Sequence, residues 1–246
     1  MSEQKPTIVL VHGAFAESSS WNGVIAQLQQ HDVNAVAVAN PLRSLAGDAA
    51  YVRDVLASID GPIVLVGHSY AGLVITEAAV GNDAVVGLVY VGAFVPETGQ
   101  SAFDLSNSAP GSTLGDALAA YPVSSGGNEF AIRPELFHHQ FAADVSAEVA
   151  SLMAATQRPV TQAALSEGLP TEHPAWRDIP SWHVFGEKDL NIPVAVHRAG
   201  AERAASRGTN EIAGASHAIS VSEPAAVAAT IAEAAKAYVA SLSAAA

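Results

Sequence analysis

The sequence predicts a single α/β domain with a doubly wound, mostly parallel sheet of about six strands, and three observations support this. Short apolar runs rich in β-branched residues alternate with stretches of helical periodicity, as in βαβ units. Half of the 246 residues are hydrophobic and only 14% are charged, which is enough to fill a large core. One serine, Ser69, lies between a strand run and a helical run without an intervening loop.

The first part of the chain supplies four strands in regular alternation with helices. Apolar runs typical of buried strands cover 7–11, 33–38, 63–66 and 85–91. Helical spacing of apolar residues lies between them, over 18–28, 48–59 and 73–79, and Ser18, Ser19 and Ser20 are candidate caps for the first helix. This order predicts parallel strands joined by right-handed crossovers, with helices on both faces of the sheet.

The alternation stops after residue 95 and resumes at about residue 179. The segment 96–178 contains no run with the composition of a buried strand, so we expect an insertion into a core domain of residues 1–95 and 179–246. Its first part, to Gly127, is rich in turn residues, and helices are expected from Pro134, from Ser146 and over 161–167. The core then continues with a strand at 182–185, a helix at 194–205, a strand at 209–212 and a terminal helix from about residue 222.

Composition and charge argue against several classes of function. The chain has no cysteine, which excludes disulfides, thiolate metal sites and a cysteine nucleophile. Its formal net charge of −13 argues against binding to nucleic acid or to an anionic membrane surface, because both require a basic face. The first residues lack the pattern of a signal peptide, and the apolar runs are short for a membrane span. We therefore expect a soluble cytoplasmic protein.

Three polar residues follow strand runs at the sheet edge where ligands collect in doubly wound folds. Ser69 follows the run 63–66, Asp189 follows 182–185 and His217 follows 209–212. A serine hydroxyl becomes a good nucleophile when a base takes its proton, and an imidazole base is oriented and stabilised by a carboxylate. We predict that Ser69 is the nucleophile, His217 the base and Asp189 the acid.

A tetrahedral intermediate at this serine would carry an oxyanion that needs hydrogen-bond donors already in place. The helix that starts after Ser69 offers the backbone N–H of Tyr70, and the loop after the first strand offers that of Ala14. We predict an oxyanion hole formed by these two amides.

Four segments together resemble the α/β-hydrolase superfamily, in particular its small single-domain branch of plant-type methyl esterases, hydroxynitrile lyases and related bacterial esterases. The segments are Val9-Leu10-Val11-His12-Gly13-Ala14, Gly67-His68-Ser69-Tyr70-Ala71-Gly72, Gly186-Glu187-Lys188-Asp189 and Ala215-Ser216-His217. The resemblance implies that residues 96–178 form a helical cap over the serine. It also implies hydrolysis of a small-molecule ester without a cofactor or a metal.

Residues within these motifs favour an esterase over the hydroxynitrile lyases, dehalogenases and epoxide hydrolases of the same fold. In hydroxynitrile lyases of this type a threonine takes the place of Gly13 and a lysine takes that of Ala218, so cyanide release would have no stabilising group here. Dehalogenases and epoxide hydrolases of the fold use aspartate where this chain has Ser69. The common motif also has glycine in place of Ala71, so we expect its methyl group to crowd the turn.

We therefore expect an esterase that acts on small, largely apolar esters through an acyl-enzyme. Lactone or carbon–carbon bond hydrolysis and perhydrolysis with the same residues remain alternatives. A hydroxynitrile lyase and a non-catalytic ligand receptor on the same scaffold are further alternatives. A homodimer is also compatible with the sequence.

Other residues in the sequence permit competing interpretations. The expected substrate pocket includes Gly13, Phe15 and, from the helices of the insertion, Phe137, Phe141 and Met153, although helical spacing in that region is equally typical of core packing. Glu187, Asp178, Glu97 and Asp104 are alternative acids that we interpret as surface charges. The pair His138-His139 does not predict a metal site, since neighbouring residues on a helix do not face one point.

Overall fold

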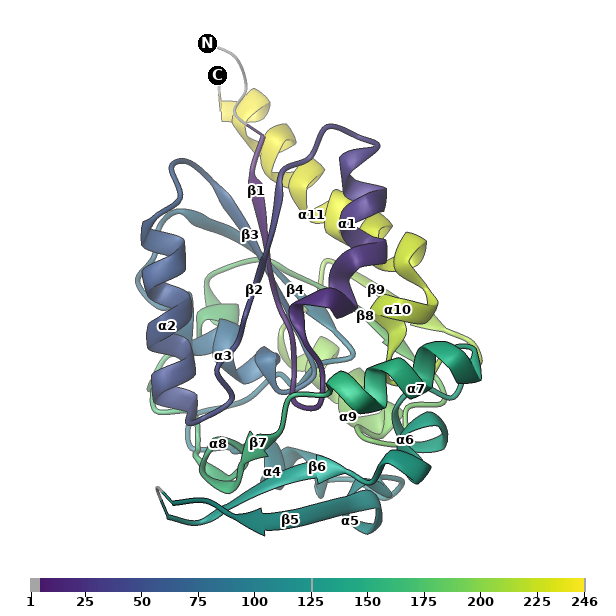
Figure 1. Cartoon of the computed structure of the whole chain (residues 1–246). Coiled ribbons are helices and arrows are strands. Elements are labelled where there is room, and N and C mark those ends of the chain that lie inside the picture. Colours follow the sequence, from purple (N-terminus) through teal and green to yellow (C-terminus); the bar gives the residue numbers. More distant parts are fainter. Residues whose placement is uncertain (1–4, 125, 246) are drawn as a thin grey trace.

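A six-stranded sheet forms the centre of the molecule in the computed structural model, which describes residues 5–124 and 126–245 (Figure 1). Every pair of neighbouring strands is parallel, and the predicted doubly wound sheet is confirmed. The strands in spatial order are β2 (Ala35–Val38), β1 (Thr7–Val11), β3 (Ile63–His68), β4 (Val85–Val91), β8 (Ser181–Gly186) and β9 (Gly208–Ile212).

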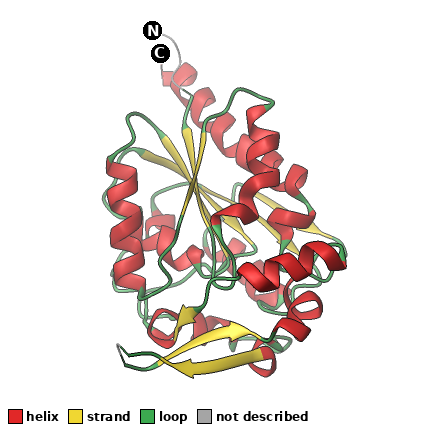
Figure 2. Ribbon diagram, in the orientation of Figure 1, coloured by secondary structure: helices red, strands yellow, loops and turns green. Residues whose placement is uncertain are grey.

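Helices cover both faces of this sheet and create two hydrophobic cores (Figures 1 and 2). Alternate residues of a strand point to opposite faces, so Leu65 belongs to one core while Val64 belongs to the other. The first core lies under α2 (Leu45–Ala57), α3 (Ala71–Ala78) and α9 (Val194–Arg203). The second lies under α1 (Asn22–Gln29), the short α10 (Ile219–Ser222) and α11 (Pro224–Ala245). Burial on both faces explains why the central strands are continuous apolar runs.

The start of α1 differs from the sequence-based expectation. A 3-10 turn, η1 (Ser18–Trp21), precedes the helix, and no side chain caps the first turn of α1. Ser20 instead donates its hydroxyl hydrogen to the Glu17 carbonyl. Trp21, fully buried, packs in the second core and anchors this turn.

By length and composition, the terminal helix α11 is apolar and long enough to cross a membrane. This differs from the expectation that the apolar runs of the sequence are too short for a membrane span. Along one side, Val227, Ile231 and Ala234 are buried in the second core against the sheet. That pattern is typical of a helix that packs on a sheet.

The segment between β4 and β8 combines short helices with a second sheet, at the bottom of Figure 1. Its strands pair antiparallel, whereas the sequence predicts a turn-rich first part followed by helices and no strand in this segment. Residues of β5 are mostly exposed, so the sequence there lacks the apolar run that marks a buried strand. The elements are α4 (Ala102–Ser106), α5 (Leu114–Ala117), β5 (Leu118–Pro122), β6 (Asn128–Ile132), α6 (Pro134–Phe141), α7 (Ala147–Thr156), β7 (Val160–Thr161), α8 (Gln162–Ser166) and the 3-10 turn η2 (Ala175–Arg177).

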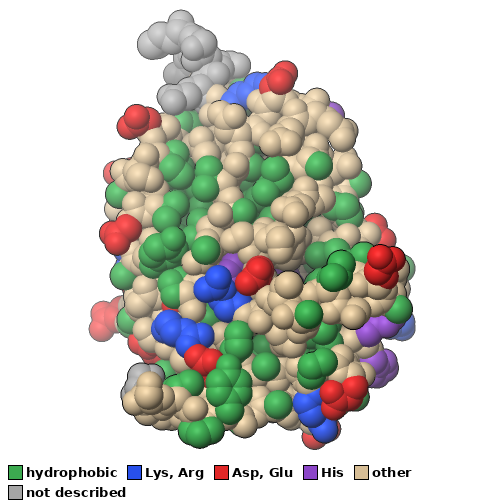
Figure 3. Space-filling model, in the orientation of Figure 1, with side chains coloured by type: hydrophobic (Ala, Val, Ile, Leu, Met, Phe, Trp, Pro, Cys, Tyr) green, Lys and Arg blue, Asp and Glu red, His purple; other side chains and the backbone are tan. Residues whose placement is uncertain are grey.

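Contacts with the loop after β2 join this second sheet to the core. The Thr161 backbone N–H donates to the Leu42 carbonyl at 3.1 Å, and the Thr161 hydroxyl donates to the Arg43 carbonyl at 2.6 Å. Arg43 also forms an ion pair with Glu129 of β6. On the face shown in Figure 3, basic side chains lie beside acidic ones without a continuous basic patch.

Candidate active site

Strand β3 passes into α3 through a sharp turn at Ser69. The backbone of Ser69 has φ of +57°, in the left-handed region that non-glycine residues rarely adopt. Such strain is maintained where the surrounding structure enforces it, and it commonly marks functional sites. The turn presents the Ser69 hydroxyl at the carboxyl end of the sheet, as predicted for a nucleophile elbow.

The close approach expected at Ala71 occurs one residue later. A Cβ atom built on Gly72 would lie 2.0 Å from the Phe94 carbonyl oxygen, so only glycine fits there. Ala71 itself is fully buried as the first residue of α3 and packs in the first core. Its methyl group therefore fills core space, and the tight contact that closes the elbow belongs to Gly72.

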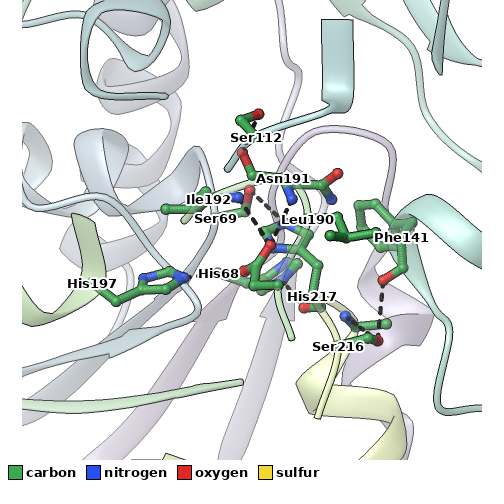
Figure 4. A network of polar contacts seen from close by, with 12 residues as sticks. His68, Ser69, Ser112, Phe141, Leu190, Asn191, Ile192, His197, Ser216 and His217 are labelled. Atoms are coloured by element: carbon green, nitrogen blue, oxygen red, sulfur yellow. Dashed lines mark hydrogen bonds and ion pairs between the residues drawn. The ribbon is translucent and has the colours of Figure 1, made fainter. Parts of the chain in front are cut away.

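The structure brings Ser69, His217 and Asp189 together from three separate loops. Figure 4 shows Ser69 and His217 in this network. Ser69 Oγ lies 2.9 Å from His217 Nε2, and His217 Nδ1 lies 2.6 Å from Asp189 Oδ2. All three residues are buried, and Ser69 is the most exposed of them at 7%. Asp189 follows β8 and His217 follows β9, so the parallel order of the strands places both beside the elbow.

The carboxylate of Asp189 determines which ring nitrogen of His217 carries a hydrogen. Burial alone would raise the pKa of Asp189, but neighbouring His217 and the hydrogen bonds from His197 and His217 hold that pKa well below its ordinary value. An ionised carboxylate only accepts hydrogen bonds, so His217 Nδ1 carries the hydrogen. His217 Nε2 is then free to accept the Ser69 proton, which is the arrangement that activates a serine.

The other carboxylate oxygen of Asp189 is held by the backbone. Its Oδ1 accepts from the N–H groups of Asn191 and Ile192, at 2.8 and 2.9 Å. These donors were not identified from the sequence, although their position directly after the acid is the signal that could have indicated them. They fix which oxygen faces His217.

Two backbone amides beside Ser69 are free to bind an anion. Within residues 5–124 and 126–245, neither the Ala14 nor the Tyr70 N–H has a protein acceptor, and both residues line the cavity at Ser69. The adjacent amide of Phe15 is instead occupied by the Arg158 carbonyl at 3.1 Å. Two unpaired N–H groups at this place are what an oxyanion hole requires.

His12 and Asn40 hold the loop that carries Ala14. The Asn40 backbone N–H donates to His12 Nε2 at 3.0 Å, so the hydrogen of this imidazole is on Nδ1, which donates to the Gly13 carbonyl. Asn40 Nδ2 also donates to the His12 carbonyl at 3.0 Å. These two hydrogen bonds from Asn40 explain why a buried histidine follows the first strand.

Gly13 lets this loop pack directly against the elbow. A Cβ atom on Gly13 would lie 2.6 Å from Ser69 Cβ and 2.7 Å from the His68 carbonyl oxygen. A threonine could therefore not be accommodated at this position without movement of the loop or the elbow. Gly13 packs against Ser69 and His68 and is not among the described residues that line the cavity.

A cavity of about 230 Å³ opens above Ser69 and His217. One part of its wall is apolar and another part carries hydroxyl, amide and carboxylate groups. The apolar part includes Ala14, Phe15, Phe94, Ala102, Leu114, Leu165 and Ile192, and the polar part includes Ser106, Asn107, Ser112, Thr113, Asp116 and Asn191.

Of the residues expected in the substrate pocket, Phe15 lines this cavity. The other four are not among the described residues that line it: Gly13, Phe137, Phe141 and Met153. Phe137 and Phe141 are buried and stack on each other, and Phe141 contacts the edge of His217 at a ring distance of 4.9 Å. Helix α6 thus packs beside the base, while α4 and the stretch 112–118 supply the wall. That stretch is polar and turn-rich, so its sequence gave no sign of a pocket.

The alternative acids all have partners away from Ser69. Glu187 accepts from the Gly214 N–H, and Asp104 caps α4 through Ser101. Asp178 lies 3.0 Å from His173 Nε2 at the surface, and the partly exposed Glu97 forms an ion pair with Arg177.

The neighbouring histidines His138 and His139 do not converge on one point. His138 Nε2 lies 2.9 Å from the Val145 carbonyl, and His139 is exposed.

Three buried histidines make the stability of the fold depend on pH. Burial lowers the pKa of His12 to about 4 and the pKa values of His68 and His183 to about 3, from an ordinary value of 6.5. The unfolded chain therefore binds more protons below about pH 6.5, and stability falls as pH falls. We expect each histidine to lower the free energy of unfolding by about 1.4 kcal/mol between about pH 7.5 and about pH 5.5.

Denaturant titrations at the two pH values measure this loss. In a His183→Gln variant the loss between the two pH values should shrink by about one third, since one of the three groups is removed. The exposed His31 offers a matched control, and His31→Gln should leave the difference unchanged. A free energy of unfolding that is equal at both pH values would show that these histidines accept protons in the folded state.

Comparisons with known proteins identify the family and the fold. The model of the alpha/beta hydrolase family matches residues 8–230. The alpha/beta hydrolase nvfD of Aspergillus novofumigatus is 30% identical over 212 residues, which cover 78% of this chain and 81% of that protein. A carbendazim hydrolyzing esterase of Nocardioides sp. is 35% identical over 112 residues, 38% of this chain and 44% of that protein. The crystal structure of polyneuridine aldehyde esterase has a TM-score of 0.80 at 22% identity, with 94% of this chain and 99% of that chain covered.

Proposed function

Because the chain belongs to the alpha/beta hydrolase family, we propose that it is a serine esterase that cleaves small, largely apolar carboxylic esters through an acyl-enzyme. The observation that carries the proposal is the contact chain from Ser69 through His217 to Asp189, which faces a cavity beside two unpaired amides. The esterases among its relatives support ester hydrolysis as the reaction.

In the first half of the reaction, Ser69 Oγ attacks the ester carbonyl carbon while His217 Nε2 takes the serine proton. The carbonyl oxygen becomes an oxyanion, which accepts hydrogen bonds from the Ala14 and Tyr70 amides. Collapse of this intermediate breaks the bond to the alcohol, and His217 returns the proton to the leaving oxygen. Asp189 stays ionised throughout and stabilises the imidazolium form of His217.

In the second half, water replaces the alcohol. His217 accepts a proton from the water as its oxygen attacks the acyl carbon, and the same two amides hold the second oxyanion. The bond between the acyl carbon and Ser69 Oγ then breaks while His217 Nε2 returns its proton to Oγ, which releases the carboxylic acid and restores the serine hydroxyl. No step requires a cofactor.

The cavity supports a small substrate with an apolar portion. Its volume of about 230 Å³ lies below the usual range of drug-sized ligand sites, and Phe15, Phe94 and Ile192 provide apolar contact close to Ser69. The hydroxyl and amide groups of Ser112 and Asn107 line the same cavity and suit a substrate with a polar end.

The residue after the base argues against cyanohydrin cleavage. Ala218 is buried and donates its backbone N–H to the Phe141 carbonyl at 2.9 Å, so it offers no cation to a departing cyanide. Lactones and activated carbon–carbon bonds could use the same nucleophile and remain second candidates.

A substrate panel tests the proposal. We expect purified protein to hydrolyse p-nitrophenyl esters from acetate to butyrate faster than the corresponding laurate, because the cavity is small. Lactones, cyanohydrins and 1,3-diketones complete the panel. Faster turnover of any of these three classes than of every ester would overturn the assignment, and binding without turnover of any substrate would favour a receptor.

A further inference from the structure

A second histidine, His197, contacts the carboxylate of Asp189. His197 lies on α9, is 2% exposed and places Nε2 3.0 Å from Asp189 Oδ2. This is the same oxygen that faces His217 Nδ1 at 2.6 Å. In Figure 4, His197 lies at the left edge of the network, away from Ser69.

The proton positions in this pair follow from the carboxylate. Because an ionised carboxylate only accepts, His197 must present an N–H at Nε2, as His217 does at Nδ1. With the two backbone amides on Oδ1, the carboxylate of Asp189 accepts four hydrogen bonds, two on each oxygen. These four donors together hold the carboxylate in the orientation that faces His217.

The ring of His197 is itself fixed by packing. It stacks on Phe185 of β8 with ring centres 4.9 Å apart and planes 14° apart. His197 is not among the described residues that line the cavity, so it does not touch a substrate there. Any effect on the reaction must be transmitted through Asp189.

Sharing one oxygen between two donors has an electrostatic consequence. Each hydrogen bond to a carboxylate withdraws part of its charge. Oδ2 of Asp189 therefore accepts less strongly from His217 than it would without the hydrogen bond from His197. A weaker acceptor stabilises the imidazolium of His217 less.

We propose that His197 is a positioning residue of the active site, which locks Asp189 toward His217 and sets the basicity of that histidine by sharing Oδ2. The kinetic part of this inference rests on the proposed esterase function. The part that concerns the proton affinity of His217 depends only on the geometry of the resting protein.

Other ionisable groups surround this pair. Glu211 on β9 interacts electrostatically with His197 and forms an ion pair with Arg198. His68 on β3 lies 4.7 Å from His217 between ring centres, and His183 lies on β8, the same strand as Phe185. Burial lowers the pKa values of His68 and His183 to about 3, so both are neutral near neutral pH. Asp144 bonds Ser216 next to the base and is unchanged in the variants below.

Two replacements separate a positioning role from packing. His197→Phe keeps a flat ring against Phe185 and removes the donor, whereas His197→Gln keeps a side-chain N–H of similar reach. His139, exposed on α6, provides the control variant His139→Gln. His197→Met, which also lacks a donor, replaces the phenylalanine variant if that protein does not fold.

NMR titration of the imidazole nitrogens in the resting protein measures the pKa of His217, with the signal assigned by its loss in His217→Gln. We expect the donor-free variant to raise that pKa by about one pH unit. The acid limb of kcat/KM for p-nitrophenyl acetate should move up by the same amount, with about tenfold lower activity below it. His197→Gln and His139→Gln should stay near the wild type.

Equal pKa values of His217 in the wild type and the donor-free variant would overturn the inference. It would also be overturned if the pKa of His217 shifted equally in the donor-free variant and in His197→Gln. The NMR result is independent of turnover. A shifted pKa in a protein that hydrolyses no ester would therefore support the role of His197 and contradict the proposed function.

Discussion

Replacing Ser69 with alanine is expected to lower kcat for a short-chain p-nitrophenyl ester by about 10⁵-fold. The hydroxyl of Ser69 is the only hydroxyl within hydrogen-bond distance of His217 Nε2 among the residues that the structure describes. Without it the acyl-enzyme cannot form, and only direct attack of water near the two free amides remains. Steady-state hydrolysis measured at high enzyme concentration detects the residual rate.

The exposed Ser58 offers a matched control for this loss. Ser58→Ala removes an identical hydroxyl far from the cavity and should keep the wild-type rate. The fold should also survive in Ser69→Ala, since the change removes one atom from a turn that Gly72 closes. Hydrolysis by Ser69→Ala within tenfold of the wild type would show that another residue is the nucleophile.

Replacing Asp189 with asparagine is expected to lower kcat by about 10⁴-fold, although the two side chains have the same shape. The N–H groups of Asn191 and Ile192 require an oxygen at the Oδ1 position, so the new amide nitrogen would face His217 Nδ1. That nitrogen is a donor, and it forces the hydrogen of His217 onto Nε2. The imidazole would then present an N–H to Ser69 and could not accept the serine proton.

Glu187 tests whether this effect is specific, because it is a carboxylate two residues away in the same loop. It is exposed and bonded to the Gly214 N–H, so Glu187→Gln should leave kcat within about twofold of the wild type. The tautomer of His217 in Asp189→Asn can be read from its imidazole nitrogen shifts. An unchanged tautomer together with an unchanged rate would exclude Asp189 as the acid.

The parallel core could be predicted closely because its signals are local. Strands buried on both faces are continuous apolar runs, and the strand expected at 85–91 is found with the same limits as β4. Ser69, Asp189 and His217 could be placed at one sheet edge from strand order alone, since the carboxyl ends of parallel strands meet there.

The second sheet and the cavity wall could not be predicted, because their signals depend on tertiary contacts. Strand β5 is largely exposed, and its pairing with β6 is specified by partners that a single sequence does not reveal. Phe137 and Phe141 have the helical spacing expected of pocket or core, and only the orientation of α6 decides between them. Asn107 and Thr113 line the cavity from turn-rich segments without any local motif.

His197 illustrates a further limit. A histidine eight residues after the acid, on a helix of ordinary composition, carries no sequence signal for contact with Asp189. The contact arises because α9 begins shortly after the acid loop and packs against β8, which brings its buried face back to the carboxylate.

Covalent labelling with a fluorophosphonate tests the central claim most directly, because such reagents react with a serine that a neighbouring base has activated. The account predicts one adduct per chain, located on Ser69 by peptide mass spectrometry, abolished in Ser69→Ala and slowed in Asp189→Asn. An adduct on another residue, or labelling of Ser69→Ala at the wild-type rate, would contradict it.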